Sequence, residues 1–264
     1  MLLAIDVGNT NIRIGVFNDD DLIGSWKIMT NTTKTSDEFG LFITSALMHQ
    51  NVEKSCISDV IISSVVSSLI HVLKNSIIRY FNVIPLIVGP GVNTGITVND
   101  QNLVEIGYDQ ICDIAACYNL YGGPAIVINF GTVTTYNFVT DKGFLDFSVT
   151  SPGIRICSDA LWKKSVQLPD FQIKKSTRNL DKNHIISMQE EISYGYIGQV
   201  QYIIDKIIEE TGLNNVKIVV TGICAKFIVS EIKHIDFYDT KLTLKGLRII
   251  FEINSSGKST SMPL

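Results

Sequence analysis

Two short polar turns with similar sequences could together bind the phosphate groups of a nucleotide. In the first turn, the apolar residues 2–7 carry Asp6 near their end, and Gly8 follows before a second apolar run begins. In the second turn, Asn129 stands where Asp6 stood and Gly131 where Gly8 stood, an offset of 129 − 6 = 123 residues. Glycine allows a ligand to approach the backbone closely, and a neighbouring carboxylate can face a metal ion. Two such turns therefore predict a polyphosphate site.

The polar side chains after each glycine fit the same chemistry. Asn9 and Thr10 follow Gly8, and Thr132 follows Gly131, so each turn offers hydroxyl or amide groups beside backbone N–H groups. A pair of tight hairpins without a ligand is the alternative, because such residues are common in turns. One turn alone would favour that alternative, whereas two turns in the same register favour phosphate binding.

Asp109 is a candidate for acid–base chemistry. It follows Gly107 at the start of a predicted helix, where the backbone dipole stabilises a carboxylate. Such an acid can simply cap the first turn of the helix. It can also act as a general base that accepts the hydroxyl proton of a phosphoryl acceptor.

The elements that would position these residues form two similar series. A capping box at Thr35–Glu38 predicts a helix to residue 49, and Gly122-Gly123-Pro124 predicts a boundary after the helix 108–121. A second capping box at residues 187–190 predicts a helix that Gly212 ends. The predicted strands are residues 2–7, 11–17, 22–29, 59–64, 84–88, 125–130, 133–139, 143–149 and 217–221, and a further helix is predicted over 68–80.

Both halves therefore begin with a strand, a polar turn and a strand, and later supply strand–helix units. This order predicts an α/β protein with two duplicated βββαβα domains of the actin-like, ribonuclease H-like type and a nucleotide cleft between them. Chance repetition of a common turn is the alternative. The predicted domains are residues 1–122 and 123–252, and the small polar residues 253–264 are expected to form a flexible tail.

The composition narrows the classes of function. In 264 residues, 45% hydrophobic and 18% charged residues favour a folded core over disorder, and a net charge of −4 argues against nucleic acid as a partner. No apolar run approaches the roughly 20 residues that span a bilayer, and no signal peptide is recognisable. The five cysteines are odd in number and scattered, which is typical of a reducing compartment. We therefore expect a cytoplasmic protein without membrane partners.

Several motifs, taken together, resemble the type III pantothenate kinase family. They are AIDVGNTNI, VGPGVNTGI, VEIGYDQI, YGGPAIVINFGTVTT, SPGIRICSDAL, QLP, SYGYIGQV and LTLKGLRIIFE, and they extend from Met1 to about Glu252. The resemblance implies membership of the actin-like, sugar-kinase-like ATPase superfamily. It also implies ATP-dependent phosphorylation of pantothenate, the first step of coenzyme A biosynthesis. The implied enzyme is a homodimer that needs a divalent metal such as Mg²⁺ and a monovalent cation such as K⁺ or NH4⁺.

The resemblance also implies roles for individual residues. Asp109 matches the catalytic base, Asp6 would help to place the divalent metal, and Asn129 would face the monovalent cation. The implied ATP-binding residues are Asp6, Val7, Gly8, Asn9, Thr10, Asn11, Ile12, Arg13, Gly131 and Thr132. The implied substrate-binding residues are Asp100, Gly107, Tyr108, Gln110 and His184.

Several positions depart from the usual pattern of the family. Gln110 replaces an arginine, so a neutral amide stands where a charged fork could bind an anion through two donors. Asn129 replaces an aspartate and keeps only a carbonyl oxygen for a cation. Asp100 stands where the family has a tyrosine, His184 where it has a threonine, and Ile223 where it has a second glycine. Most of these departures lie on the side of the acceptor and the cation.

These departures keep two alternatives open beside pantothenate phosphorylation. A catalytically impaired member could bind a nucleotide or a partner and act as a regulator. A kinase of the same fold could instead phosphorylate another small hydroxyl compound, for which Asp100, Gln110 and His184 would be the altered acceptor contacts.

Overall fold

The computed structural model describes residues 1–98, 106–164, 184–222 and 228–256. The chain forms two compact units, and the first of them is discontinuous in sequence. The first unit contains Met1–Leu120 together with Lys241–Leu264, and the second contains Tyr121–Thr240. Residues 241–252, which the sequence led us to expect in the second half, therefore belong to the first unit.

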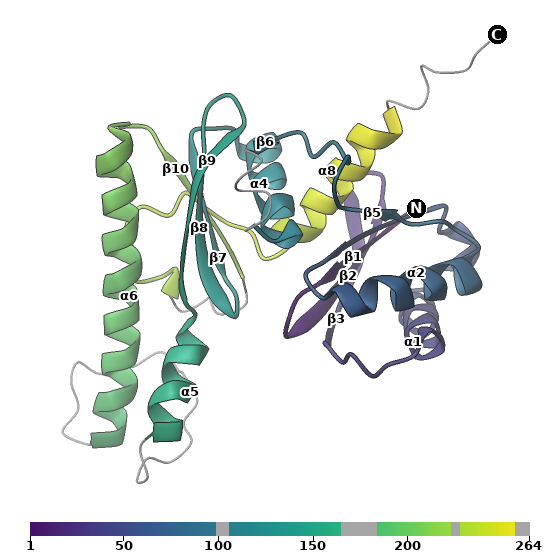
Figure 1. Cartoon of the computed structure of the whole chain (residues 1–264), viewed down its shortest axis with the longest axis horizontal. Helices are drawn as coiled ribbons and strands as arrows, with labels where there is room; N and C mark the ends of the chain where they lie inside the picture. The colour runs from purple at the N-terminus through teal and green to yellow at the C-terminus, as the bar shows by residue number, and fades with distance from the viewer. Residues whose placement is uncertain (99–105, 165–183, 223–227, 257–264) are drawn as a thin grey trace. The chain divides into compact units, whose positions relative to one another are not determined.

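The first unit is built on a sheet of five strands in the order β3-β2-β1-β4-β5 (Figure 1). Strand β1 is antiparallel to β2 and parallel to β4, and all six of its residues are buried. A continuous apolar run suits such a central strand, because both of its faces are covered. The strands are β1 (Leu2–Val7), β2 (Asn11–Asn18), β3 (Asp21–Met29), β4 (Asp59–Ser64) and β5 (Leu86–Ile87).

Helices α1 (Ser36–His49) and α2 (Ser67–Phe81) cover one face of this sheet (Figure 1). Alternate residues of β1, among them Ile5, point to this face and pack in the apolar core with both helices. The capping box is confirmed at the start of α1. The Thr35 hydroxyl accepts the Glu38 N–H, and the Glu38 carboxylate accepts the Thr35 N–H.

Helices α4 (Tyr108–Tyr121) and α8 (Leu242–Ser256) pack against the opposite face. Leu2 and Ala4 of β1 contribute to this second core, so successive side chains of β1 point alternately to the two apolar cores. The helices approach closely at Gly246, where any side chain would collide with the backbone carbonyl of Cys112. Glycine is required at this crossing because the two backbones touch.

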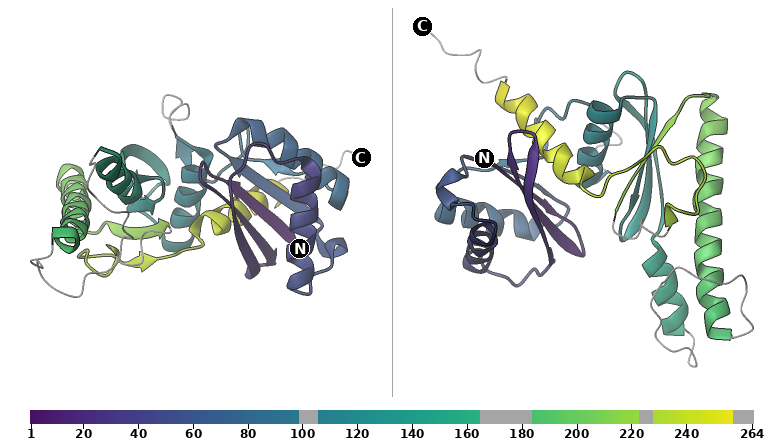
Figure 2. Two further views of the ribbon diagram at one scale, coloured as in Figure 1. Left: turned by 90° about the horizontal axis from the view of Figure 1, so that it is seen from below. Right: turned by 180° about the vertical axis from the view of Figure 1, so that it is seen from behind.

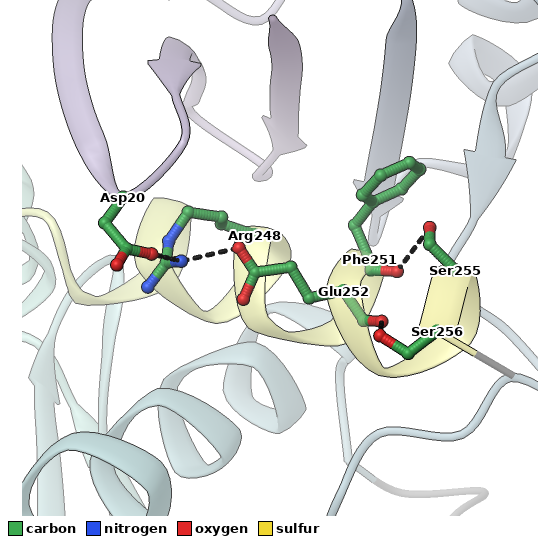
Figure 3. Close-up of polar contacts among 6 residues, drawn as sticks. All are labelled: Asp20, Arg248, Phe251, Glu252, Ser255 and Ser256. Atoms are coloured by element: carbon green, nitrogen blue, oxygen red, sulfur yellow. Dashed lines mark hydrogen bonds and ion pairs between the residues drawn. The ribbon is translucent and has the colours of Figure 1, made fainter.

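Helix α8 extends further than its sequence suggests, because residues 253–256 continue the helix instead of beginning a tail. Figure 3 shows its last turns, in which the hydroxyls of Ser255 and Ser256 donate to backbone carbonyls one turn earlier. Arg248 pairs with Glu252 on the same helix and with Asp20 in the turn between β2 and β3. The pair with Asp20 ties α8 to the turn between β2 and β3. Two further short elements in the described part of this unit are the 3-10 turn Lys54–Cys56 and strand β6 (Thr97–Val98).

The second unit repeats the topology of the first. Five strands of its six-stranded sheet follow the order β9-β8-β7-β10-β11, which corresponds strand for strand to β3-β2-β1-β4-β5. Strand β7 is antiparallel to β8 and parallel to β10, as β1 is to β2 and β4. This confirms the duplicated fold. The strands are β7 (Ala125–Phe130), β8 (Val133–Val139), β9 (Phe144–Pro152), β10 (Lys217–Gly222) and β11 (Phe237–Tyr238).

Helix α6 (His184–Thr211) runs along one face of the second sheet, as the right view in Figure 2 shows, and α5 (Ile154–Lys164) precedes it. Gly212 ends α6 at a φ of +64°, as predicted. The helix begins at His184, however, so the start predicted at residues 187–190 lies inside it. None of the helices in the described ranges is both long and apolar enough to cross a bilayer.

Candidate functional site

Asp6 lies at the centre of a buried polar cluster in the first unit. Its carboxylate is fully buried and binds side chains from two neighbouring strands. Arg13 donates from Nε and Nη2 to Oδ2 at 2.9 and 2.8 Å, and the Ser63 hydroxyl donates to Oδ1 at 2.7 Å. All three residues are on the face of the sheet that α4 and α8 cover.

The strand register brings this cluster together. In the sheet, Asp6 of β1 is directly opposite Arg13 of β2 and Ser63 of β4. Residues that are opposite in neighbouring strands point to the same face, so their side chains must meet. The predicted phosphate-loop residue Arg13 therefore lies beside the predicted metal carboxylate.

Asp109 lies in the first turn of α4 and is partly buried. Burial raises the pKa of its carboxyl to about 6, and the negative charge of Asp6 adds to this effect. The backbone N–H of Gln110 and the positive charge of Arg13 act in the opposite direction. A side chain at Gly107 would collide with the carboxylate of Asp109 and displace it from this position. This carboxyl can gain and lose a proton near neutral pH, as a general base must.

A second buried acid lies one helical turn after Asp109. Asp113 is fully buried, and its Oδ1 accepts the hydroxyl of Thr243 from α8 at 2.5 Å. Burial acts to lower the pKa of Arg13, but the charges of Asp6, Asp113 and Asp109 outweigh it, so the pKa is raised and the guanidinium stays charged. Sequence reasoning missed Ser63, Asp113 and Thr243. A polar residue that closes a buried strand, as in DVIISS, is the signal that could have found Ser63.

The first predicted phosphate loop is a tight hairpin between β1 and β2. The N–H of Gly8 donates to the carbonyl of Asn11 at 3.0 Å, and a side chain at position 8 would lie only 3.1 Å from that oxygen. The Thr30 hydroxyl donates to the carbonyl of Gly8 at 2.6 Å. Asn9 and Thr10 are exposed at the tip. These hydrogen bonds fix the base of the hairpin, and the polar side chains at its tip are accessible to solvent.

The second predicted loop has a similar frame. The N–H of Gly131 donates to the carbonyl of Val133 at 3.1 Å, which closes the turn between β7 and β8. A side chain at Gly153 would collide with the carbonyl of Thr132, and one at Gly222 would lie 2.5 Å from the carbonyl of Phe130. Two backbone segments therefore press against this loop, and glycine is needed at both.

Asn129 occupies the position in β7 that Asp6 occupies in β1. It is directly opposite Thr135 of β8 and Thr221 of β10, as Asp6 is opposite Arg13 and Ser63. The hydroxyls of Thr135 and Thr221 are buried, and neither finds a hydrogen-bond partner among the described residues. The first half thus has a carboxylate with charged and hydroxyl partners, and the second half has an amide between two threonines.

The predicted substrate residues are only partly described. Tyr108, which precedes Asp109 in α4, packs against the apolar core to which α8 contributes. The side-chain carbonyl oxygen of Gln110 is buried without a hydrogen-bond partner in the described part of the chain. His184 is the first residue of α6. Asp100 and Ile223 lie outside the described residues.

Solved structures with the same fold include a Baf-family protein from Campylobacter jejuni, with a TM-score of 0.62 and 19% identity, covering 96% of this chain and 99% of that one. The activator of 2-hydroxyisocaproyl-CoA dehydratase from Clostridium difficile, solved with bound ADPNP, has a TM-score of 0.58 and 9% identity over 100% of this chain and 98% of that one. These similarities concern the fold, which is the duplicated α/β fold of the actin-like type.

The sequence comparisons are more specific. The pattern of the type III pantothenate kinase family matches residues 2–206. A type III pantothenate kinase from Agathobacter rectalis is 46% identical over 251 residues, which cover 95% of this chain and 96% of that protein. The chain belongs to the type III pantothenate kinase family.

Proposed function

We propose that the chain transfers the terminal phosphoryl group of ATP to pantothenate, with Asp109 as the general base. Membership of the type III pantothenate kinase family supports this reaction, which is the first step of coenzyme A biosynthesis. The single observation that supports the role of Asp109 is its position. It is a partly buried carboxyl at a helix start, beside Asp6, with a pKa raised to about 6.

Asp109 would accept the proton of the pantothenate hydroxyl as the phosphoryl group is transferred in line. A base works best when its pKa is near the operating pH, because it must be ionised and yet able to hold a proton. In the first unit, the hairpin 8–11 would bind phosphate groups of ATP through backbone N–H and hydroxyl groups. In the second unit, the turn at Gly131-Thr132 would offer groups of the same kind to a phosphate. Gly107, Tyr108 and Gln110 adjoin the base and would contact the acceptor, with Asp100 and His184 as further predicted contacts.

The divalent metal that this reaction uses fits the first unit. Among the described residues, no group of three His, Cys, Asp or Glu side chains could hold a metal without other ligands. Mg²⁺ is commonly held by one or two carboxylates together with substrate phosphates, so a single Asp6 near a phosphate loop suffices. When bound, such a metal neutralises the charge that develops on the phosphate oxygens.

A monovalent cation such as K⁺ or NH4⁺ fits the second unit. Thr135 and Thr221 present buried hydroxyl oxygens without hydrogen-bond partners in the described residues, on either side of Asn129. Oxygen atoms of this kind can replace the hydration shell of K⁺. We propose that these three residues hold the cation. Turnover in potassium and in sodium buffers, compared between the native chain and Thr135→Val, tests the assignment.

A homodimer and cytoplasmic residence complete the proposal. The resemblance to the family supports the dimer, and the molar mass in solution measured by light scattering tests it. The free thiols of Cys56, Cys112, Cys117 and Cys157 support a reducing compartment.

The decisive experiment measures phosphopantothenate formation and ADP release by purified protein with ATP, with and without pantothenate. Asp109→Asn should lower turnover by a factor of 10² to 10⁴, the usual contribution of a general base. If ADP release does not depend on pantothenate but increases with another hydroxyl compound, that compound is the acceptor. Nucleotide binding without any product would instead identify a non-catalytic member of the family.

A further inference from the structure

The carboxylate proposed to hold the divalent metal is already bound by a cation of the same chain. Arg13 directs two nitrogens, Nε and Nη2, at the single oxygen Oδ2 of Asp6, at 2.9 and 2.8 Å. The hydroxyl of Ser63 takes the other oxygen at 2.7 Å. Asp6 is fully buried, so no part of its carboxylate is in contact with water. Three donors therefore satisfy it without a metal.

Each carboxylate oxygen offers about two lone-pair sites, and the two nitrogens of Arg13 occupy both sites of Oδ2. Mg²⁺ binds carboxylate oxygens at about 2.0–2.1 Å, which would bring it close to both nitrogens of Arg13. Like charges at such a separation repel strongly in a buried site, where water screens them little. Binding a metal at Oδ2 therefore requires Arg13 to move away.

We propose that Arg13 is an internal cation that occupies Asp6 in the nucleotide-free protein and leaves it when the metal–nucleotide complex binds. The inference rests on the proposed role of Asp6. A metal ion alone would have to compete with Arg13, so its affinity is low. A nucleotide brings phosphate anions that can accept the displaced guanidinium, since arginine pairs well with phosphate. Arg13 thus makes metal binding depend on nucleotide binding.

The surroundings of Arg13 make this movement feasible. Besides Asp6, the carboxylates of Asp109 and Asp113 both act on its charge. Asp113 is fixed in place by the hydroxyl of Thr243. A guanidinium that leaves Asp6 therefore stays in a strongly negative environment and is not left as an uncompensated buried charge. Its side chain is about one-fifth exposed, so it has room on the solvent side.

The test measures Mn²⁺ binding without nucleotide, by the EPR signal of the free ion. Arg13→Met removes the competing charge and should bind Mn²⁺ about 10- to 100-fold more tightly than the native chain, the range expected for one charged hydrogen-bonded contact. Arg13→Lys keeps the charge and should remain near the native affinity. Adding Asp6→Asn to Arg13→Met should abolish the gain. Equal Mn²⁺ affinities of the native chain and Arg13→Met would overturn the inference.

A second measurement needs no substitution, because Arg13→Met could fold poorly with Asp6 left unpaired. A crystal structure of the native chain with Mn²⁺ and a non-hydrolysable ATP analogue should show Mn²⁺ at Asp6 and the Arg13 guanidinium beyond hydrogen-bond distance of it. Mn²⁺ at Asp6 with Arg13 still bound there would overturn this inference but leave the proposed role of Asp6 intact. Mn²⁺ held entirely away from Asp6 would overturn both.

Discussion

Protonation of Asp109 should set the acidic limb of the pH–rate profile. Burial, together with the charge of Asp6, raises the pKa of Asp109 from 3.8 to about 6. A carboxyl with this pKa is about nine-tenths ionised at pH 7 and about one-tenth ionised at pH 5. Because only the ionised form can accept a proton, kcat/KM for pantothenate should fall about tenfold from its plateau to pH 5.

The same shift has a consequence for stability. The folded-state pKa of Asp109 lies above its unfolded value, so folding favours the neutral carboxyl. This stabilisation is fully present below about pH 3.8 and is lost as the pH rises through 6. The difference corresponds to about 3 kcal/mol. Asp109→Asn, which stays neutral, should therefore raise the free energy of unfolding at pH 8 by up to that amount while it lowers turnover by a factor of about 10² to 10⁴.

The assay is coupled ADP release from pH 5 to 8 at saturating Mg-ATP, with urea unfolding at both extremes. Asp37→Asn is a matched control, because Asp37 also lies in the first turn of a helix but pairs with Arg79 at the surface. It should leave the pH profile unchanged. An acidic limb centred at pH 4 or below, or an Asp109→Asn enzyme that keeps a tenth of its activity, would refute the reasoning.

Three substitutions test other parts of the structure. Gly107→Ala should lower kcat at least tenfold with little change in Tm, because the new methyl group displaces the catalytic carboxylate. Gly89→Ala is the control and should be silent, because its methyl group makes only an ordinary contact with the carbonyl of Ile87 at 3.9 Å. Thr243→Val removes the donor to a buried carboxylate and should lower the free energy of unfolding in urea by about 1–3 kcal/mol; no loss would disprove that contact. Gly222→Ala, at a φ of +103° and against the second loop, should raise the KM for ATP several-fold, whereas Gly212→Ala, which also has a positive φ but open surroundings, should affect stability alone.

The elements that local sequence determines could be predicted well. Strand β1 was expected over residues 2–7 and is found there, because a short apolar run between turn residues defines a buried strand. The start of α1 followed from the capping box at Thr35. The repeated topology was also predicted, because each half begins with a strand, a polar turn and a strand and later supplies strand–helix units.

The partners of the site residues could not be predicted, because they come from distant parts of the chain. Ser63 reaches Asp6 across 57 residues, and Thr243 reaches Asp113 across 130. Only the parallel pairing of β1 with β4 and the return of α8 bring them together. The ion pair of Arg13 with Asp6 was missed for a different reason. The sequence shows that both are near one turn, but the strand register decides that they face each other.

The return of α8 to the first unit affects how the protein is made. A ribosome releases the strands of that unit first and the helix that completes it last, after the whole of the second unit has emerged. Until then, the apolar side chains of Leu2 and Ala4 lack the cover that Leu244 and Leu247 provide. The nascent chain therefore exposes this apolar surface until its synthesis is nearly complete. A chain truncated by a premature stop codon just before α8 would keep the surface exposed and would be bound by chaperones or degraded by proteases.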